Sequence, residues 1–244
     1  MEAGWEELAP GVVRHRMPGW DETVGAVAGS AGVLVVDTGA SLREGAWLRR
    51  QLEGIFGRPV THMALTHPHF DHVLGAAAFA GVEVYGAVGI DTCLARSRDE
   101  LREDAVRHGA DREETAQAVD VLVRPHHRVV GELTVSLGDR EVLLANVGPA
   151  HTAHDLAVLV PAGSGGRDVV FCGDLVEESG EPQAGPDAHP LHWPAALDRL
   201  LALGGEDAVY VPGHGAVVDA AFVRAQRDAL ARRFGVSPRE PRTE

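Results

Sequence analysis

Four short apolar segments of this chain each run into a turn that is marked by glycine or proline and carries histidine or aspartate. Short apolar segments of this kind are typical of buried β-strands. Loops at strand ends are held by a rigid scaffold, and functional sites are usually built there. The sequence therefore predicts a strand-rich scaffold with a functional site in its loops. The four turns occupy residues 66–72, 148–155, 173–174 and 213–215.

The rest of the chain alternates between short apolar runs and amphipathic stretches, a pattern typical of α/β proteins. Ser41 and Glu44 have the spacing of a helix capping box, so the first clear helix should begin at Ser41. Further helices are expected after His72 through Phe79, across much of residues 90–119, from Pro194 through Leu203, and after Asp219 through Phe234. The expected strands are Gly11–His15, Thr23–Ala28, Val33–Asp37, Thr61–Leu65, Val82–Tyr85, Arg128–Val135, Glu141–Val147, Leu156–Val160, Val169–Cys172 and Ala208–Val211.

With 244 residues, the chain suits one large domain or two small ones. Its apolar residues (45%) and charged residues (24%) are balanced as in globular proteins, which excludes disorder along the whole chain. We expect one domain over residues 1–235, made of two similar halves at about 1–118 and 119–235, with a sheet from each half facing the other. Residues 236–244 are polar and contain proline, and we expect this tail to be disordered.

The formal net charge of −14 disfavours a nucleic-acid partner, because nucleic-acid-binding proteins usually present a basic face. The longest apolar stretches, such as Val33–Val36, are far shorter than the roughly 20 residues of a membrane helix, so no membrane association is expected. The acidic N-terminus lacks the pattern of a signal peptide, and only two cysteines are present. Both observations predict a cytoplasmic protein.

The strongest functional signal is the segment H-P-H-F-D-H at residues 67–72, which holds four potential metal ligands. Such a turn can aim His67 and His69 at one ion while Asp71 and His72 point to a neighbouring one. Imidazole and carboxylate without thiolate suit zinc, and also iron or manganese. A surface loop that is merely rich in histidine would not explain the three further candidates that follow the other apolar segments: His151, Asp174 and His214.

Together these residues resemble the pattern of the metallo-β-lactamase-fold hydrolase superfamily. The resemblance implies an αββα four-layer sandwich in which two mixed sheets face each other, helices lie outside, and the site lies at one edge between the sheets. The match extends from about residue 10 to residue 233 and consists of the H-x-H-x-D-H motif at 67–72, His151, Asp174, His214 and the early motif Val36-Asp37-Thr38-Gly39.

The resemblance also implies a role for each of these side chains. Asp37 would hydrogen-bond near the ligands and fix their orientation instead of binding metal. Two metal ions would be held by seven side chains: His67, His69 and His151 on the first ion, Asp71, His72 and His214 on the second, and Asp174 bridging both.

The implied activity is hydrolysis. A hydroxide that bridges two zinc ions would attack a carbonyl group, in an ester, thioester, lactone or amide, of a small molecule. Paired metals lower the pKa of shared water towards neutrality, which supplies a nucleophile near pH 7. Asp71 would orient the hydroxide and relay a proton, so it is the candidate catalytic residue.

Two alternatives from other classes stay open. The same fold supports an iron persulfide dioxygenase, in which His67, His151 and Asp174 would hold one iron while the other ligands stay free of metal. It also supports a non-catalytic binder of small molecules. One iron per chain together with oxygen consumption would identify the dioxygenase.

The substrate is narrowed by one departure from the family. In the β-lactamases that carry cysteine at the bridging position, a lysine follows for the carboxylate of the drug, whereas here Asp174 is followed by Glu177, which has the opposite charge. Efficient β-lactamase activity is therefore not expected. A small-molecule substrate is expected, and a homodimer is possible. The candidate substrate-binding residues lie in two loops and are Trp20, His189, His192 and Trp193.

Overall fold

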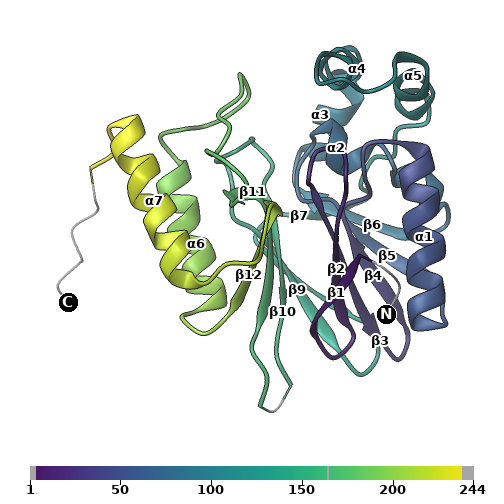
Figure 1. The fold of residues 1–244 in the computed structure, drawn as a ribbon, viewed down its shortest axis with the longest axis horizontal. Helices are drawn as coiled ribbons and strands as arrows, with labels where there is room; N and C mark the ends of the chain where they lie inside the picture. The colour runs from purple at the N-terminus through teal and green to yellow at the C-terminus, as the bar shows by residue number, and fades with distance from the viewer. Residues whose placement is uncertain (1–3, 164, 238–244) are drawn as a thin grey trace.

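The computed structural model describes residues 4–163 and 165–237, and its strands form two sheets (Figure 1). The first sheet has seven strands in the order β1-β2-β3-β4-β5-β6-β7, and the second has five in the order β12-β11-β10-β9-β8. Both sheets are mixed, because β4 to β7 run parallel to one another and β12 runs parallel to β11, while the other neighbours are antiparallel. The strands are β1 (Trp5–Ala9), β2 (Val12–Arg16), β3 (Thr23–Gly29), β4 (Gly32–Val36), β5 (Val60–Ala64), β6 (Glu83–Ala87), β7 (His127–Val129), β8 (Glu132–Ser136), β9 (Glu141–Asn146), β10 (Leu156–Val160), β11 (Val169–Glu177) and β12 (Val209–His214).

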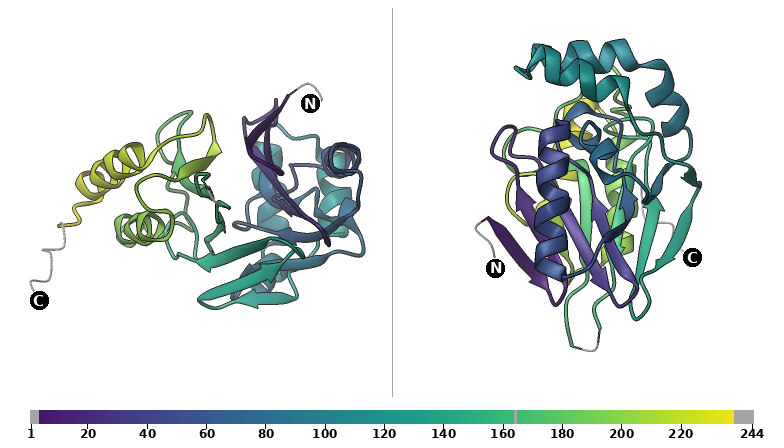
Figure 2. Two further views of the ribbon diagram at one scale, coloured as in Figure 1. Left: turned by 90° about the horizontal axis from the view of Figure 1, so that it is seen from below. Right: turned by 90° about the vertical axis from the view of Figure 1, so that its right-hand side faces the viewer.

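Helices cover the outer side of each sheet, so the molecule has four layers (Figures 1 and 2). Three buried apolar clusters separate these layers: one under the helices of each side, and one between the two sheets. This arrangement confirms the predicted αββα sandwich. On the side of the seven-stranded sheet lie α1 (Leu42–Phe56), α2 (Phe70–Val73), α3 (Ile90–Arg96), α4 (Arg98–Arg107) and α5 (Arg112–Asp120), and on the other side α6 (Trp193–Gly204) and α7 (Ala220–Phe234).

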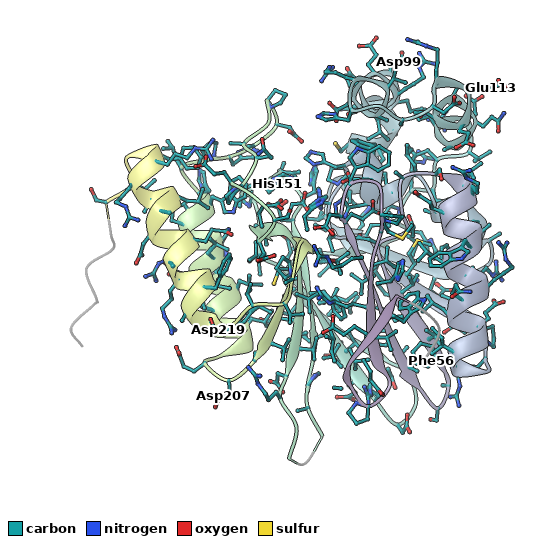
Figure 3. All side chains as sticks on the ribbon, in the orientation of Figure 1. Phe56, Asp99, Glu113, His151, Asp207 and Asp219 are labelled. Carbon is teal, nitrogen blue, oxygen red and sulfur yellow. The ribbon has the colours of Figure 1, made fainter. Side chains whose placement is uncertain are left out.

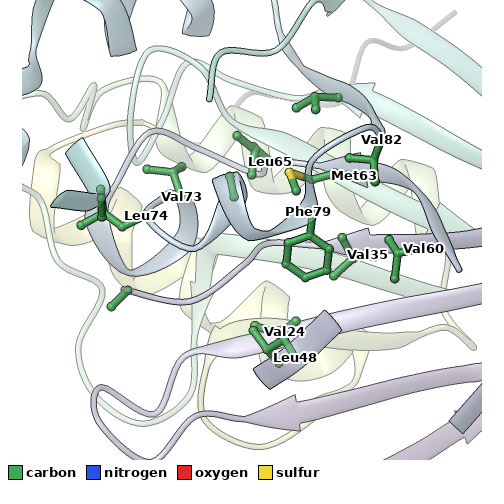
Figure 4. Close-up of a cluster of buried hydrophobic side chains, with 14 of the residues drawn as sticks. Val24, Val35, Leu48, Val60, Met63, Leu65, Val73, Leu74, Phe79 and Val82 are labelled. Atoms are coloured by element: carbon green, nitrogen blue, oxygen red, sulfur yellow. The ribbon is translucent and has the colours of Figure 1, made fainter. Parts of the chain in front are cut away.

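The strand β4 shows why the central strands are continuous apolar runs. Val33 and Val35 belong to the cluster that contains Leu48 of α1, part of which Figure 4 shows. Leu34 and Val36 belong instead to the cluster between the sheets. Strands that are covered on both faces need apolar residues at successive positions, and burying each such side chain contributes about 1.5–3 kcal/mol.

The predicted strands differ from the observed ones in two places. The single strand expected over Arg128–Val135 is two strands, β7 and β8, that belong to different sheets. Val130 lies between them and is 76% exposed, so the chain leaves one sheet for the other at this apolar residue. The edge strand β1 was not predicted, because it exposes Glu6 and Glu7 and buries only Trp5 fully.

Two helix starts agree with the capping residues in the sequence. Ser41 Oγ accepts a hydrogen bond from the backbone nitrogen of Glu44 at 3.2 Å, at the start of α1. Asp219 Oδ1 accepts one from the backbone nitrogen of Phe222 at 2.9 Å, at the start of α7. Within the residues that the structure describes, no helix is long and apolar enough to cross a membrane.

The helix predicted from His72 through Phe79 is instead a pair of short pieces. The short helix α2 ends at Val73, and a 3-10 turn covers Ala76–Phe79. Gly75 lies between them, and a Cβ atom there would come within 1.9 Å of the carbonyl oxygen of Thr38. The close approach of these two backbones requires glycine and breaks the helix. The helical stretch expected over residues 90–119 is divided into α3, α4 and α5.

Candidate metal centre

The seven predicted metal ligands lie on or just after strands β5, β9, β11 and β12, and in the short helix α2. Those from the first half of the chain lie in the turn after β5 and in α2, and those from the second half lie after β9, on β11 and at the end of β12. Figure 3 labels His151, which lies between the two sheets. The site is therefore assembled by both sheets from the residues His67, His69, Asp71, His72, His151, Asp174 and His214.

The ligand atoms form two groups that meet at Asp174. In each group the atoms lie within 4.8 Å of one another: His67, His69, His151 and Asp174 make one group, and Asp71, His72 and His214 make the other. Asp174 Oδ2 lies 3.6 Å from His67 Nε2 and 3.5 Å from His151 Nε2 in the first group. It also lies 3.3 Å from His214 Nε2 in the second group. Asp174 thus lies between the groups, where a carboxylate can serve both.

All five imidazole rings have their outward nitrogen bonded to another part of the protein. Where the partner is a carbonyl or a carboxylate oxygen, that nitrogen must donate, so in a neutral ring the other nitrogen turns a lone pair into the centre. The partners are Thr66 Oγ1 for His67 Nδ1 (2.9 Å), Asp187 Oδ2 for His69 Nε2 (3.0 Å), Asp37 Oδ2 for His72 Nδ1 (2.9 Å), the Gln183 carbonyl for His151 Nδ1 (3.1 Å) and the Trp20 carbonyl for His214 Nδ1 (2.8 Å).

The buried carboxylate of Asp37 supports two of these rings. Its Oδ2 accepts hydrogen bonds from His72 Nδ1 and from the hydroxyl of Thr66 at 2.7 Å, and that hydroxyl oxygen accepts in turn from His67. Its Oδ1 accepts from the backbone nitrogen of Thr66 at 2.8 Å. Asp37 has a φ of 61°, in the left-handed region that aspartate tolerates better than most residues. The structure therefore places Asp37 as the resemblance implied, beside the candidate ligands.

Two glycines shape the backbone around Asp174. A Cβ atom at Gly213 would lie 1.9 Å from Asp174 Oδ1, so only glycine allows β12 to pass the carboxylate so closely. Gly173 has a φ of 52°, and the register of β11 against β12 shifts there. Cys172 therefore packs in the apolar cluster under α6, although it lies only two residues from Asp174.

The donor set fits a divalent metal. His67 Nε2 and Asp174 Oδ1 are buried and have no hydrogen-bond partner, although buried polar atoms are nearly always paired. Burial lowers the pKa of His151 to about 4 and that of His67 well below its ordinary value, so both rings stay neutral. Neutral imidazoles beside a carboxylate are what a cation such as zinc requires.

The electrostatics of the second group also favour a cation. Burial opposes a charge on His214, but the carboxylate of Asp174 raises the pKa of this ring to about 10. Burial likewise opposes the ionisation of Asp174, yet His72, His67 and His214 hold its pKa well below its ordinary value. Asp174 is thus ionised and attracts positive charge to this group, and a bound cation would take the place of the proton on His214.

Trp20 lies at the tip of the hairpin between β2 and β3 and supports the second group. Its carbonyl receives the hydrogen bond from His214, and its ring packs edge-on against Phe70 at a centroid distance of 5.3 Å. Its indole nitrogen donates to the carbonyl oxygen of His108 at 3.4 Å, next to the end of α4. The structure therefore gives Trp20 a positioning role, and its contact with substrate stays a prediction.

The prediction that Trp193 contacts substrate was wrong. Trp193 starts α6 and is completely buried, and its indole nitrogen donates to the Leu175 carbonyl at 3.0 Å. Its ring lies 5.3 Å from that of His151, so it packs behind a candidate ligand. His192 is exposed and His189 is half-buried, and neither joins a ligand group, so their contact with substrate stays a prediction.

Sequence reasoning missed several groups around the centre. Asp187 and the Gln183 carbonyl, which hold His69 and His151, come from the loop between β11 and α6. Glu22 is fully buried with no hydrogen-bond partner for either carboxylate oxygen, and burial raises its pKa well above the ordinary value. Glu177, by contrast, was singled out in the sequence for its charge, and it has a carboxylate oxygen within 4.8 Å of ligand atoms of Asp174 and His214.

Comparison with known proteins decides the family. The family model described as "Metallo-beta-lactamase superfamily" matches residues 18–214, which is well over half of the chain. The chain belongs to the metallo-β-lactamase superfamily. Among curated members, "Metallo-beta-lactamase domain-containing protein 1" of Xenopus laevis is 28% identical over 197 residues, which cover 80% of this chain and 71% of that protein.

Solved structures of metallo-β-lactamases share the fold of this superfamily member. A metallo-β-lactamase from Pontibacter korlensis superposes with a TM-score of 0.69 at 20% identity, over 93% of this chain and 97% of that one. The metallo-β-lactamase FIM-1 from Pseudomonas aeruginosa, in its mono-zinc form, gives 0.69 at 21% identity, over 96% of each chain. At these identities the similarity to solved structures shows the fold alone. Membership of the superfamily and the His/Asp clusters together support a metal-binding hydrolase in general terms.

Proposed function

We propose that this metallo-β-lactamase-superfamily protein is a hydrolase that binds two Zn²⁺ ions and cleaves an ester, thioester, lactone or amide of a small molecule. The observation that carries the proposal is the position of Asp174. One of its carboxylate oxygens lies 3.5 Å from His151 Nε2 in the first group and 3.3 Å from His214 Nε2 in the second. A carboxylate shared in this way lowers the repulsion between two neighbouring cations.

The chemistry is divided between metal and protein. Two bound zinc ions supply Lewis acidity, which makes hydroxide available near pH 7 and polarises a carbonyl. The imidazole rings hold these ions through lone pairs that their outward hydrogen bonds aim inward. Asp71 Oδ2 lies 3.4 Å from His214 Nε2 and 3.7 Å from His72 Nε2, and is 6% exposed as a residue. From this position Asp71 orients the attacking water and carries a proton toward the leaving group.

The charge of Glu177 restricts the substrate. Its carboxylate lies beside Asp174 and His214, and the hydroxyl of Ser179 donates to it at 2.6 Å. A substrate carboxylate on this side of the centre would meet a like charge, which costs binding energy. We therefore favour substrates that are neutral or cationic near the bond that breaks, and a small molecule over nucleic acid. The free thiols of Cys93 and Cys172 suit a reducing compartment, which supports a cytoplasmic location.

The test combines metal content with activity. Protein purified without chelator should hold about two zinc ions per chain by plasma mass spectrometry, and should hydrolyse at least one member of a panel of esters, thioesters and lactones. Asp71→Asn should lower turnover by about 100-fold or more and weaken the binding of the second zinc ion, because the second group loses its charged ligand. Asp91→Asn, at a half-buried aspartate of α3 that pairs with Arg128, is the matched control and should leave turnover unchanged.

Either of two outcomes would contradict the proposal. About one iron per chain with oxygen consumption would identify the dioxygenase instead. Two zinc ions with no turnover on the panel and an unchanged cellular effect of Asp71→Asn would identify a binder without catalysis.

A further inference from the structure

A second cluster of metal-binding side chains lies at the open edge of the seven-stranded sheet. Glu83 is the first residue of β6, and His126 and His127 lead into β7, the last strand of that sheet. The Nε2 atoms of both histidines converge on one oxygen, Glu83 Oε2, at 3.0 Å for His126 and 2.5 Å for His127. The three ligand atoms lie within 4.8 Å of one another.

This edge cluster, defined as Glu83, His126 and His127, is separate from the metal centre. The strands β5, β6 and β7 run parallel, and the centre begins with His67, after the carboxyl end of β5. The edge cluster lies at the amino ends of β6 and β7. The two sets of ligands therefore lie at opposite ends of the same strands and share no residue.

Stacking against neighbouring rings holds the edge cluster in shape. Tyr85 is the register partner of His127, and their rings stack at a centroid distance of 4.5 Å and an angle of 17°. The ring of His126 lies 4.5 Å from that of His127, and His62 on β5 stacks against the ring of Tyr85 at 6.1 Å. Side chains that are already ordered lose less conformational entropy when they bind a ligand.

We propose that Glu83, His126 and His127 bind one divalent transition-metal ion, with zinc as the expected ion and water completing the coordination. Two imidazole nitrogens and one carboxylate oxygen suit zinc, copper and nickel, whereas magnesium and calcium prefer oxygen ligands alone. The side chains of Glu83, His126 and His127 are 54%, 53% and 41% exposed, so an ion and a water ligand can reach them.

Binding at the edge cluster exchanges hydrogen bonds for metal bonds. In the structure both histidines point Nε2 at Glu83, whose pKa is lowered chiefly by its hydrogen bond with His127 and then by that with His126. Glu83 is therefore an ionised ligand at neutral pH. When the metal binds, each neutral ring gives up its proton at Nε2 and takes one up at Nδ1 by exchange with water, so Nε2 turns a lone pair to the ion and the ring loses no net proton.

Such an ion would stabilise the edge of the seven-stranded sheet. The strand β7 has three residues and pairs with β6 on one side only. An ion held by Glu83 of β6 and by His126 and His127 would tie this short strand down just before the chain crosses to β8. A ligand that binds only the folded state stabilises it in proportion to the logarithm of its concentration over its dissociation constant.

The experiment counts zinc bound beyond the metal centre. Protein whose centre is already filled with zinc is titrated with further Zn²⁺ against a chromophoric chelator. The wild type should bind one additional ion with a dissociation constant of about 10 µM or tighter. His127→Gln and His126→Gln, which keep a polar side chain beside Glu83, should each weaken this binding by about 10-fold or more. Asp91→Asn removes a half-buried acidic charge that pairs with Arg128 of β7, and should leave the binding of the additional ion unchanged.

A second measurement separates binding from a folding defect. Added Zn²⁺ should raise the thermal midpoint of the wild type and of Asp91→Asn more than that of His126→Gln, whose substitution lies outside β7. The proposal is overturned if the wild type binds no additional ion in this range. It is also overturned if His126→Gln and His127→Gln bind as the wild type does, or if Asp91→Asn loses as much binding as they do. None of these outcomes depends on hydrolytic activity.

Discussion

The molecule contains two clusters of histidine and carboxylate that differ in how their rings are held. In the metal centre the outward nitrogen of each ring bonds to another group, and the inward atoms His67 Nε2 and Asp174 Oδ1 are left buried without a partner. In the edge cluster the two rings turn the same atoms that would bind metal, both Nε2, onto Glu83. The rings of the metal centre are therefore held through nitrogens that do not face the site, whereas the ligand atoms of the edge cluster hydrogen-bond to one another.

The difference shows that residue types alone do not determine how strongly a cluster of histidine and carboxylate binds metal. Burial removes water as an alternative partner, so the atoms of the centre gain most from a cation. The ligand atoms of the edge cluster are exposed and already paired, so a metal there replaces interactions that exist. We therefore expect tight metal binding and chemistry at the centre, and weaker, structural binding at the edge.

The largest expected effect comes from removing the carboxylate that joins the two groups of the centre. Asp174→Asn should lower hydrolysis by about 10³-fold or more and lower the zinc content of the centre, because both groups lose a charged ligand. Turnover on the best panel substrate and metal analysis measure the effect. Retention of near wild-type turnover and of two zinc ions would show that the two groups do not depend on Asp174.

A buried carboxylate outside both clusters provides a pH test of the role of burial. Asp155 Oδ1 accepts hydrogen bonds from the backbone nitrogen and the hydroxyl of Thr152, at 2.9 and 2.7 Å, while Oδ2 has no partner. Burial raises the pKa of Asp155 from 3.8 to about 7, whereas the pKa of exposed Glu83 is lowered by its histidines. Between pH 4 and 7 the unfolded chain therefore releases this proton before the folded protein does.

The contribution of Asp155 to the stability of the wild type should fall as pH rises through that window and should level off above it. The loss from Asp155 amounts to roughly 2–4 kcal/mol. Asp155→Asn should remove most of this slope, so the variant gains relative to the wild type as pH increases. Urea unfolding of both proteins at pH 4.5 and 8, with chelator present, checks the prediction. Parallel pH profiles for the two proteins would contradict it.

The next effect concerns the buried hydrogen bonds that orient the ligand rings. Asp37→Asn keeps the shape and tolerates the φ of 61°, but it weakens the acceptor that serves His72 and, through Thr66, His67. Zinc affinity at the centre should fall by about 10- to 100-fold, as is usual when such partners are lost. Competition with a chelator measures this loss, and an unchanged affinity would mean that the rings are held by packing alone.

The smallest effect is expected where the support is exposed. Asp187 holds His69 through one hydrogen bond, and its side chain is 48% exposed. Asp187→Ala should weaken zinc binding by less than about 10-fold, because water can replace the lost partner. The same competition assay measures the zinc affinity of Asp187→Ala for comparison with that of Asp37→Asn. A larger loss of zinc affinity in Asp187→Ala than in Asp37→Asn would contradict the proposal that buried hydrogen-bond partners support the ligands more strongly than exposed ones.

Much of the fold could be predicted because it rests on patterns that are local in sequence. The apolar run of β4 and the capping residues Ser41 and Asp219 each determine their own neighbourhood. The strand β1 was missed because an exposed edge needs no apolar run. The break at Val130 was missed because exposure of a valine depends on where two sheets part, which is a tertiary property.

The candidate site could be predicted only as far as side-chain types reveal it. The motif at residues 67–72 and the three later ligands have a recognisable order along the chain. The Trp20 and Gln183 carbonyls cannot be recognised in this way, because every residue has a carbonyl and only the fold selects these two. Trp193 looked like a loop residue beside His192, but the start of α6 turns it into the interior.

The position of Asp174 between the two groups has a thermodynamic consequence. If each group takes up an ion, the two binding events share one carboxylate and are coupled. By linkage, any factor by which an ion in the first group changes the affinity of the second must equal the factor in the other direction. The two halves of the centre therefore bind their ions as a coupled pair, and Asp174 is the side chain through which an ion in one half changes the affinity of the other.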